Sequence, residues 1–185
     1  MFIVIKVNLI YNKREIEGVF MDVICGWSVA NSILIKSFED KVYLTPAKLN
    51  CLIYLLYSEY LFLTGHPLFN ELFSKTKEGP VIDTVYFKFN SYGNDIIRDY
   101  AKDAKGKTMY VNNPLFVRCL NYVWEKYKNW SLDDVLLYIE TGHVYRYKKI
   151  DDIINNNDIL SDVIMKKEME IEQARGYVKR IMRQI

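Results

Sequence analysis

The residue types that perform most enzymatic chemistry are sparse in this chain. Its 185 residues include only two histidines, His66 and His143, and neither lies in a recognisable catalytic or metal-binding motif. The sequence also lacks a phosphate-binding loop, a dinucleotide-binding glycine turn and a nucleophile elbow. A hydrolase that uses His66 and Glu71 is the enzymatic alternative. We predict no catalytic residue, no metal and no cofactor, and therefore a protein that is not an enzyme.

The three cysteines offer no redox or metal chemistry either. Cys25, Cys51 and Cys119 are odd in number and widely spaced, so they match neither a disulfide framework nor a zinc site. The start of the chain has no basic region followed by a small-residue cleavage site, and no stretch is long and apolar enough to span a membrane. We expect buried thiols in a reducing cytoplasm and no contact with a membrane.

Lys48 is the charged residue whose position most needs an explanation. It lies in the first turn of a helix that is otherwise apolar on nearly every face. A lysine in such surroundings must pair with an acid or reach the surface. Both a structural ion pair and a contact with a partner satisfy this requirement.

That helix, expected from Thr45 to about Thr64, is the element around which the fold should form. Thr45 can cap its N-terminus, Pro46 suits the first helical position, and Gly65 can end it. A helix that is apolar nearly all round is buried on several sides. The predicted fold class is therefore mainly α, a compact helical domain around a buried central helix, which a small N-terminal β-hairpin can precede.

The stretch that follows is rich in aromatic residues and contains the candidate binding residues. Gly79 and Pro80 indicate a sharp turn, and a helix is expected to start at Pro80. Tyr86 and Phe87 point about 100° apart on a helix, so both rings cannot face inward. We predict that Tyr86 belongs to the core, and that Phe87 is exposed. Tyr92 completes this face.

Several other elements can be expected from the sequence. A helix at 27–38 places Asn31 on its buried face, where the amide needs a partner, most simply a neighbouring loop. Further helices are expected at 95–102, from Pro114 and after Ser131. Strands are expected mainly within the first 25 residues.

Several ordered motifs resemble the Panacea antitoxin-domain family, which includes SocA-like proteins and many phage and mobile-element proteins. The motifs are TPxKLxxLxY at 45–54, GxPLF at 65–69, GPVxxxxYxxFxxYG at 79–93, VANxIL at 29–34, and VWExY with SxxD at 123–134. The resemblance covers roughly residues 21–147. It implies a helical antitoxin that binds its toxin directly, in a bacterial cell and possibly encoded by a phage.

Length and composition are those of one globular domain with appendages. Hydrophobic residues make up 50%, and the net charge is +2, which gives no general attraction to nucleic acid. We divide the chain into an extension at 1–20, a Panacea-like helical domain at 21–150, and a C-terminal amphipathic helix at 151–185. The last helix can pack on the core, form a homodimer or hold a partner chain.

The favoured function is therefore a non-enzymatic antitoxin-type protein that binds a protein partner, its cognate toxin. The alternative is a phage or mobile-element protein that inhibits a host defence enzyme or serves as a protease adaptor through the same kind of surface. Candidate partner-binding residues are Lys48, Gly79, Pro80, Tyr86, Phe87 and Tyr92.

Overall fold

The computed structural model describes residues 24–182, apart from the side chains of residues 178–181, and helices dominate them. The elements in chain order are α2 (Gly26–Asp40), α3 (Pro46–Thr64), β1 (Phe73–Thr76), β2 (Gly79–Val81), α4 (Asp83–Phe89), the 3₁₀ turn η1 (Asn90–Tyr92), α5 (Pro114–Tyr127), α6 (Leu132–Glu140), α7 (His143–Tyr147), β3 (Ile153–Ile154) and α8 (Asn156–Met182). The mainly helical class is confirmed. The expected hairpin at 1–20 lies outside the described residues.

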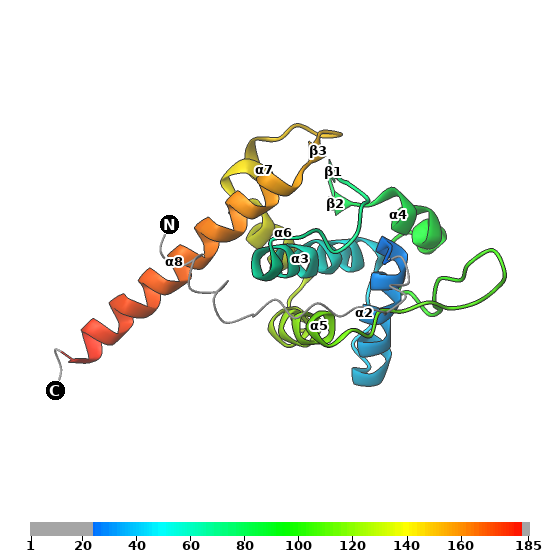
Figure 1. Cartoon of the computed structure of the whole chain (residues 1–185), viewed down its shortest axis with the longest axis horizontal. Helices are drawn as coiled ribbons and strands as arrows, with labels where there is room; N and C mark the ends of the chain where they lie inside the picture. The colour runs from blue at the N-terminus through cyan, green and yellow to red at the C-terminus, as the bar shows by residue number, and fades with distance from the viewer. Residues whose placement is uncertain (1–23, 183–185) are drawn as a thin grey trace, which may run out of the picture.

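Helix α3 is the buried centre of the fold, as predicted. The Thr45 hydroxyl accepts the backbone N–H of Lys48 at 3.4 Å, Pro46 is the first helical residue, and Gly65 ends the helix at φ 71°. Eleven of its 19 residues are buried. Helices α2, α5, α6 and α8 and strand β2 all contact it, and Figure 1 shows it in the middle of the molecule.

A small antiparallel sheet packs against the side of α3, where Phe73 contacts the rings of Tyr54 and Tyr57. Its strand order is β2-β1-β3, and β1 pairs Phe73 with Ile154 from the far end of the chain. The expectation that strands lie mainly within the first 25 residues is wrong for these three strands. Phe73 and Ile154 are both buried, so the distant pairing is stabilised by shared burial of their side chains.

Gly79 and Pro80 belong to strand β2, and the prediction that a helix starts at Pro80 is wrong. Thr76 pairs with Gly79 across a two-residue turn, and α4 begins only at Asp83. Gly79 has φ 111°, and a Cβ there would lie 2.8 Å from both Cys51 Sγ and Leu136 Cδ2. Glycine is therefore required both by the backbone conformation and by the close approach to α3 and α6.

The segment between η1 and α5 crosses the body without forming the helix that we expected at 95–102. Its backbone N–H groups bond to other parts of the chain instead: Ile97 donates to the Leu44 carbonyl at 2.8 Å, and Ala101 donates to Asn31 Oδ1 at 2.9 Å. The Asn31 amide nitrogen in turn donates to the carbonyl oxygens of Ala101 and Met109. The prediction that a neighbouring loop satisfies Asn31 is confirmed.

Helices α5 and α6 begin at caps that are visible in the sequence. Asn113 accepts the N–H of Phe116 at 2.8 Å before Pro114, and Ser131 forms a capping box with Asp134. Gly142 precedes α7, where a Cβ would lie 2.5 Å from Asp162 Oδ2. Its small size lets α8 approach closely.

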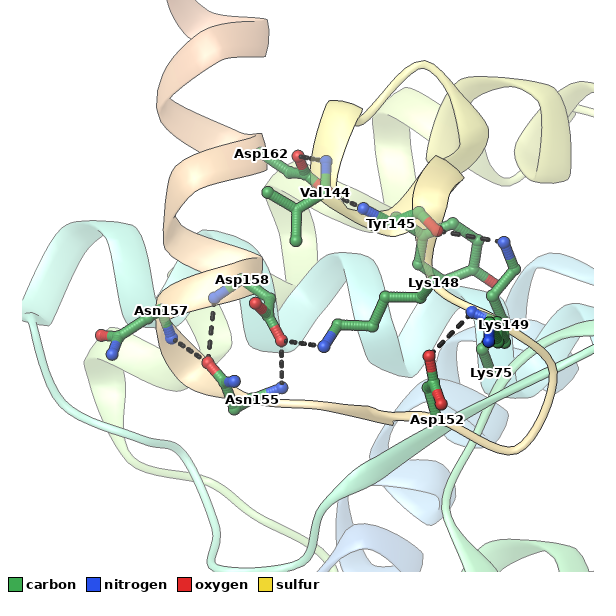
Figure 2. Close-up of polar contacts among 10 residues, drawn as sticks. All are labelled: Lys75, Val144, Tyr145, Lys148, Lys149, Asp152, Asn155, Asn157, Asp158 and Asp162. Carbon is green, nitrogen blue, oxygen red and sulfur yellow. Dashed lines mark hydrogen bonds and ion pairs between the residues drawn. The ribbon is translucent and has the colours of Figure 1, made fainter.

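A polar cluster connects the start of α8 to α7 (Figure 2). The Asp162 carboxylate accepts the backbone N–H groups of Val144 at 2.7 Å and Tyr145 at 2.8 Å. Lys148 pairs with Asp158 at 2.7 Å. The first half of α8 is thus held against the body, whereas its second half projects away from it (Figure 1). The division of the chain at residues 20 and 150 stays a prediction.

Among the helices of residues 24–182, none combines the length and the hydropathy that crossing a bilayer requires.

Candidate partner-binding surface

Helix α4 presents two aromatic rings to solvent because it is short and packs on one side only. Its seven residues follow directly from β2, and the N–H groups of Val85 and Tyr86 bond to the Ile82 carbonyl. Val85 and Phe89, four residues apart, are its buried residues and face the body. This spacing leaves Tyr86, Phe87 and Lys88, which lie between the two buried residues, exposed to solvent.

Tyr86 and Phe87 form the exposed pair. Phe87 is 72% exposed, as predicted, but Tyr86 is 49% exposed, so the prediction that Tyr86 is a core residue is wrong. Val85 takes the core position, and Tyr86 is displaced from it by one residue, about 100° around the helix. The two rings contact each other edge to face at 5.7 Å between centroids. Paired aromatic rings offer a large, preordered contact area of the kind found at binding anchors.

Lys88 holds α4 to its surroundings. Its ammonium lies 5.4 Å from the centroid of the Trp27 ring on α2 and donates to the carbonyl of Lys102. This bond connects α4 to the lysine-rich loop at 102–107. These contacts hold the C-terminal end of α4 against the body, and Tyr86 and Phe87 lie on that helix.

The structure brings some of the predicted binding residues together and separates others. Gly79 and Pro80 are buried, and Gly79 lies against Cys51 of α3 and Leu136 of α6, so neither residue is part of the exposed surface. Tyr92 packs partly against the core, and its hydroxyl donates to Asp99 at 3.2 Å. The exposed surface of this region is thus formed mainly by Tyr86 and Phe87.

Lys48 lies apart from this pair. Its ammonium donates to the carbonyl of Lys128, just past the end of α5, at 2.9 Å. Partial burial lowers the pKa of Lys48. A carbonyl at a helix C-terminus is a favourable acceptor for a cation. Lys48 therefore has a structural partner, which is a carbonyl rather than the acid that we had considered.

The pair considered for hydrolysis is not arranged for catalysis. His66 is exposed in the turn after α3. Glu71 already accepts the backbone N–H of Gly26 at 2.8 Å and the hydroxyl of Thr84 at 3.2 Å. Its carboxylate therefore connects α2 to the start of α4, which is a structural role.

Sequence reasoning missed a cluster of lysines and tyrosines where α8 docks on the body. Lys126, Lys166 and Lys167 lie over aromatic rings of α3, α5 and α6, around a cavity of about 30 Å³. Lys166 is nearly buried and donates to the Ile139 carbonyl at 3.1 Å; burial lowers its pKa to about 8. A cavity of this size holds about one water molecule, so the cluster is a docking contact. The spacing of Ile159, Val163 and Lys166 by four and three residues places them on one face of a helix, and this was the signal in the sequence that could have indicated the contact.

Comparison with known proteins supports the antitoxin resemblance. Residues 49–140 match the family described as Antitoxin SocA-like, Panacea domain. The chain carries a Panacea domain. No curated protein and no solved structure matches the chain.

The matched span runs from α3 to the end of α6 and includes β1, β2 and α4. The exposed ring pair and strand β2 therefore lie inside the Panacea domain. Helices α2, α7 and α8 lie outside the matched residues. The family favours an antitoxin-type role with a protein partner and without catalysis.

Proposed function

We propose that the chain is a non-enzymatic antitoxin that neutralises its cognate toxin by direct binding. The observation that carries the proposal is the edge-to-face pair of Tyr86 and Phe87, which is exposed within the Panacea domain. Interface anchors are enriched in aromatic residues that the partner can desolvate. A short helix, held to the body by Lys88 and by the buried Val85 and Phe89, presents these rings with little entropy left to lose on binding.

A protein is a better partner for this surface than a nucleic acid. The net charge is only +2, and several lysines are engaged within the fold, including Lys48, Lys126 and Lys167. Nucleic-acid binding relies on lysines and arginines that are available to phosphates. We place the protein in the bacterial cytoplasm, where the unpaired thiols of Cys25, Cys51 and Cys119 remain reduced.

The test uses the product of the open reading frame adjacent to this gene. That product should be toxic when expressed alone, should be harmless when co-expressed with the full chain, and should co-elute with it on size exclusion. A toxic neighbour that neither binds nor is rescued would overturn the proposal. A neighbour that is not toxic, together with binding to a host defence enzyme or protease, would favour the alternative of a phage-type inhibitor or adaptor.

A further inference from the structure

Helix α8 changes its surroundings abruptly along its length. Ile159, Val163 and Lys166 are buried against the body. Among the side chains of α8 that the structure describes, the last ion pairs to the body are Lys167 with Glu59 at 2.9 Å and Glu170 with Lys126 at 2.8 Å. Beyond Glu170, every residue from Ile171 to Tyr177 is exposed. We refer to residues 168–182 as the α8 arm.

The arm projects from the body as a single helix (Figure 1). A helix of this length is marginal in water unless one face is buried. Four of its large apolar side chains are nevertheless at least 40% exposed: Met169, Ile171, Tyr177 and Met182. This combination indicates a helix whose partner is another chain.

The sequence of the arm has the spacing of a helix–helix seam. Ile171 and Ala174 are three residues apart, and the sequence continues with Val178 and Ile181 after intervals of four and three. Alternating intervals of three and four residues place apolar side chains along one stripe of a helix, as in a coiled coil. Ala174 lets two helices approach closely at the middle of the stripe.

Charge along the arm is divided into two blocks of opposite sign. Acidic residues come first, at Glu168 and Glu172 beside Glu170, which already pairs with Lys126, and basic residues follow, at Arg175, Lys179 and Arg180. A second arm that ran parallel would place acid beside acid and base beside base. An antiparallel arm places each acidic block beside the basic block of the other chain, which is favourable.

We propose that the α8 arm pairs with the arm of a second copy of this chain, in antiparallel orientation. The pairing matches position 171 with position 181 and position 174 with position 178, so the twofold axis passes near Gly176. Such an interface is closed, because each copy uses the same surface and none is left for a third. Arg175 meets its own copy near the axis, where Glu172 of the same chain lies 3.7 Å from its guanidinium.

The dimer should be weak because the arm is short. Fifteen residues span about 22 Å at a rise of 1.5 Å per residue. Two arms of this length bury an area at the low end of specific interfaces, below about 1,200 Å². We expect dissociation in the micromolar range, and both Panacea domains keep their α4 surfaces free for toxin.

Sedimentation velocity of the full chain at about 1–200 µM tests the proposal. A monomer–dimer equilibrium is expected, and Ile171→Glu should shift it to monomer by at least tenfold. Gln173→Glu is the matched control, since it adds the same charge two residues away, on the opposite side of the helix, and should leave dimerisation within about twofold. A chain that stays monomeric throughout, or a dimer that Ile171→Glu does not affect, overturns the proposal. So does a monomeric chain whose toxin binding depends on Ile171.

Orientation is tested separately by salt and by cross-linking. Antiparallel blocks of opposite charge predict a weaker dimer at 500 mM than at 50 mM salt, whereas a parallel pair would strengthen. In a Cys25→Ser background, Tyr177→Cys near the axis should form an intermolecular disulfide on oxidation, and Ile171→Cys should not. Efficient cross-linking of Ile171→Cys would show a parallel pair and contradict the proposed orientation.

Discussion

Helices α3 and α4 both contain aromatic residues, but α3 buries two of its own, whereas α4 exposes two. Eleven of the 19 residues of α3 are buried, including Tyr54 and Tyr57, whereas α4 buries two of its seven and exposes Tyr86 and Phe87. The difference follows from their neighbours: α3 is surrounded by α2, α5, α6, α8 and β2, whereas α4 packs against α2 and α3 through Val85 and Phe89. Aromatic content alone therefore does not separate buried from exposed residues, whereas the extent of packing around each helix does.

The strongest test of this contrast removes the same atoms from a buried and an exposed leucine. Leu52 in α3 is 1% exposed, and Leu137 in α6 is 67% exposed. Leu52→Ala should lower the free energy of unfolding by about 2–5 kcal/mol, because it leaves a cavity. Leu137→Ala should change it by no more than about 0.5 kcal/mol. Denaturant unfolding measures both values, and equal effects would mean that α3 is not the rigid centre of the fold.

A smaller effect is expected where α8 docks on α7. Asp162→Ala leaves the partly buried N–H of Val144 and the buried N–H of Tyr145 without their acceptor, at a cost of about 1–3 kcal/mol. Asp162→Asn keeps one acceptor oxygen and should cost less. The free energy of unfolding, measured for both variants, should rank wild type, Asn and Ala in that order. Equal stability of all three would show that the first half of α8 is not held by this carboxylate.

The same docking contact predicts a pH dependence that is set by Lys166. Burial lowers its pKa to about 8, from an ordinary value near 10.5, while Asp162 and Glu170 favour the charged form and Lys126 opposes it. Between pH 8 and about 10.5 the unfolded chain holds a proton that the folded chain has lost, so this group makes stability rise with pH. The rise is at most about 1.4 kcal/mol per pH unit.

Lys166→Met removes this contribution and leaves the other titrating groups in place. The difference in unfolding free energy between wild type and Lys166→Met should therefore shift in favour of wild type between pH 7 and pH 9.5. Tyrosines and cysteines that titrate in the same range affect both proteins and cancel in the difference. A difference that stays constant over this range would mean that Lys166 is solvated.

Local signals in the sequence predicted much of the helical framework. The caps at Thr45 and Ser131, Pro114 at the start of α5 and the glycine at the end of α3 depend on residues within a few positions of each other. Hydrophobic spacing then indicated which helix is central. These features can be predicted because the side chain and the backbone group that it satisfies are close along the chain.

The features that were missed depend on distant contacts. Strand β1 pairs with residues about eighty positions away. The N–H of Ile97 bonds to the segment before α3, and the N–H of Ala101 bonds to α2, so neither forms a bond within a helix. The error at Tyr86 has a different origin. In a helix of seven residues, Val85 and Phe89 suffice to define the buried side, and the spacing alone did not exclude Tyr86 from it.

The central claim is that exposed rings on α4 bind the toxin while buried residues of α3 maintain the fold. The most direct measurement is the affinity of Phe87→Ala for the toxin, by calorimetry, with its melting temperature measured in parallel and Leu137→Ala as the equally exposed control. We predict that Phe87→Ala weakens binding about fivefold or more, near 1 kcal/mol or above, with an unchanged melting temperature, and that Leu137→Ala binds as wild type. Full affinity of Phe87→Ala, or unfolding caused by it, would contradict the account.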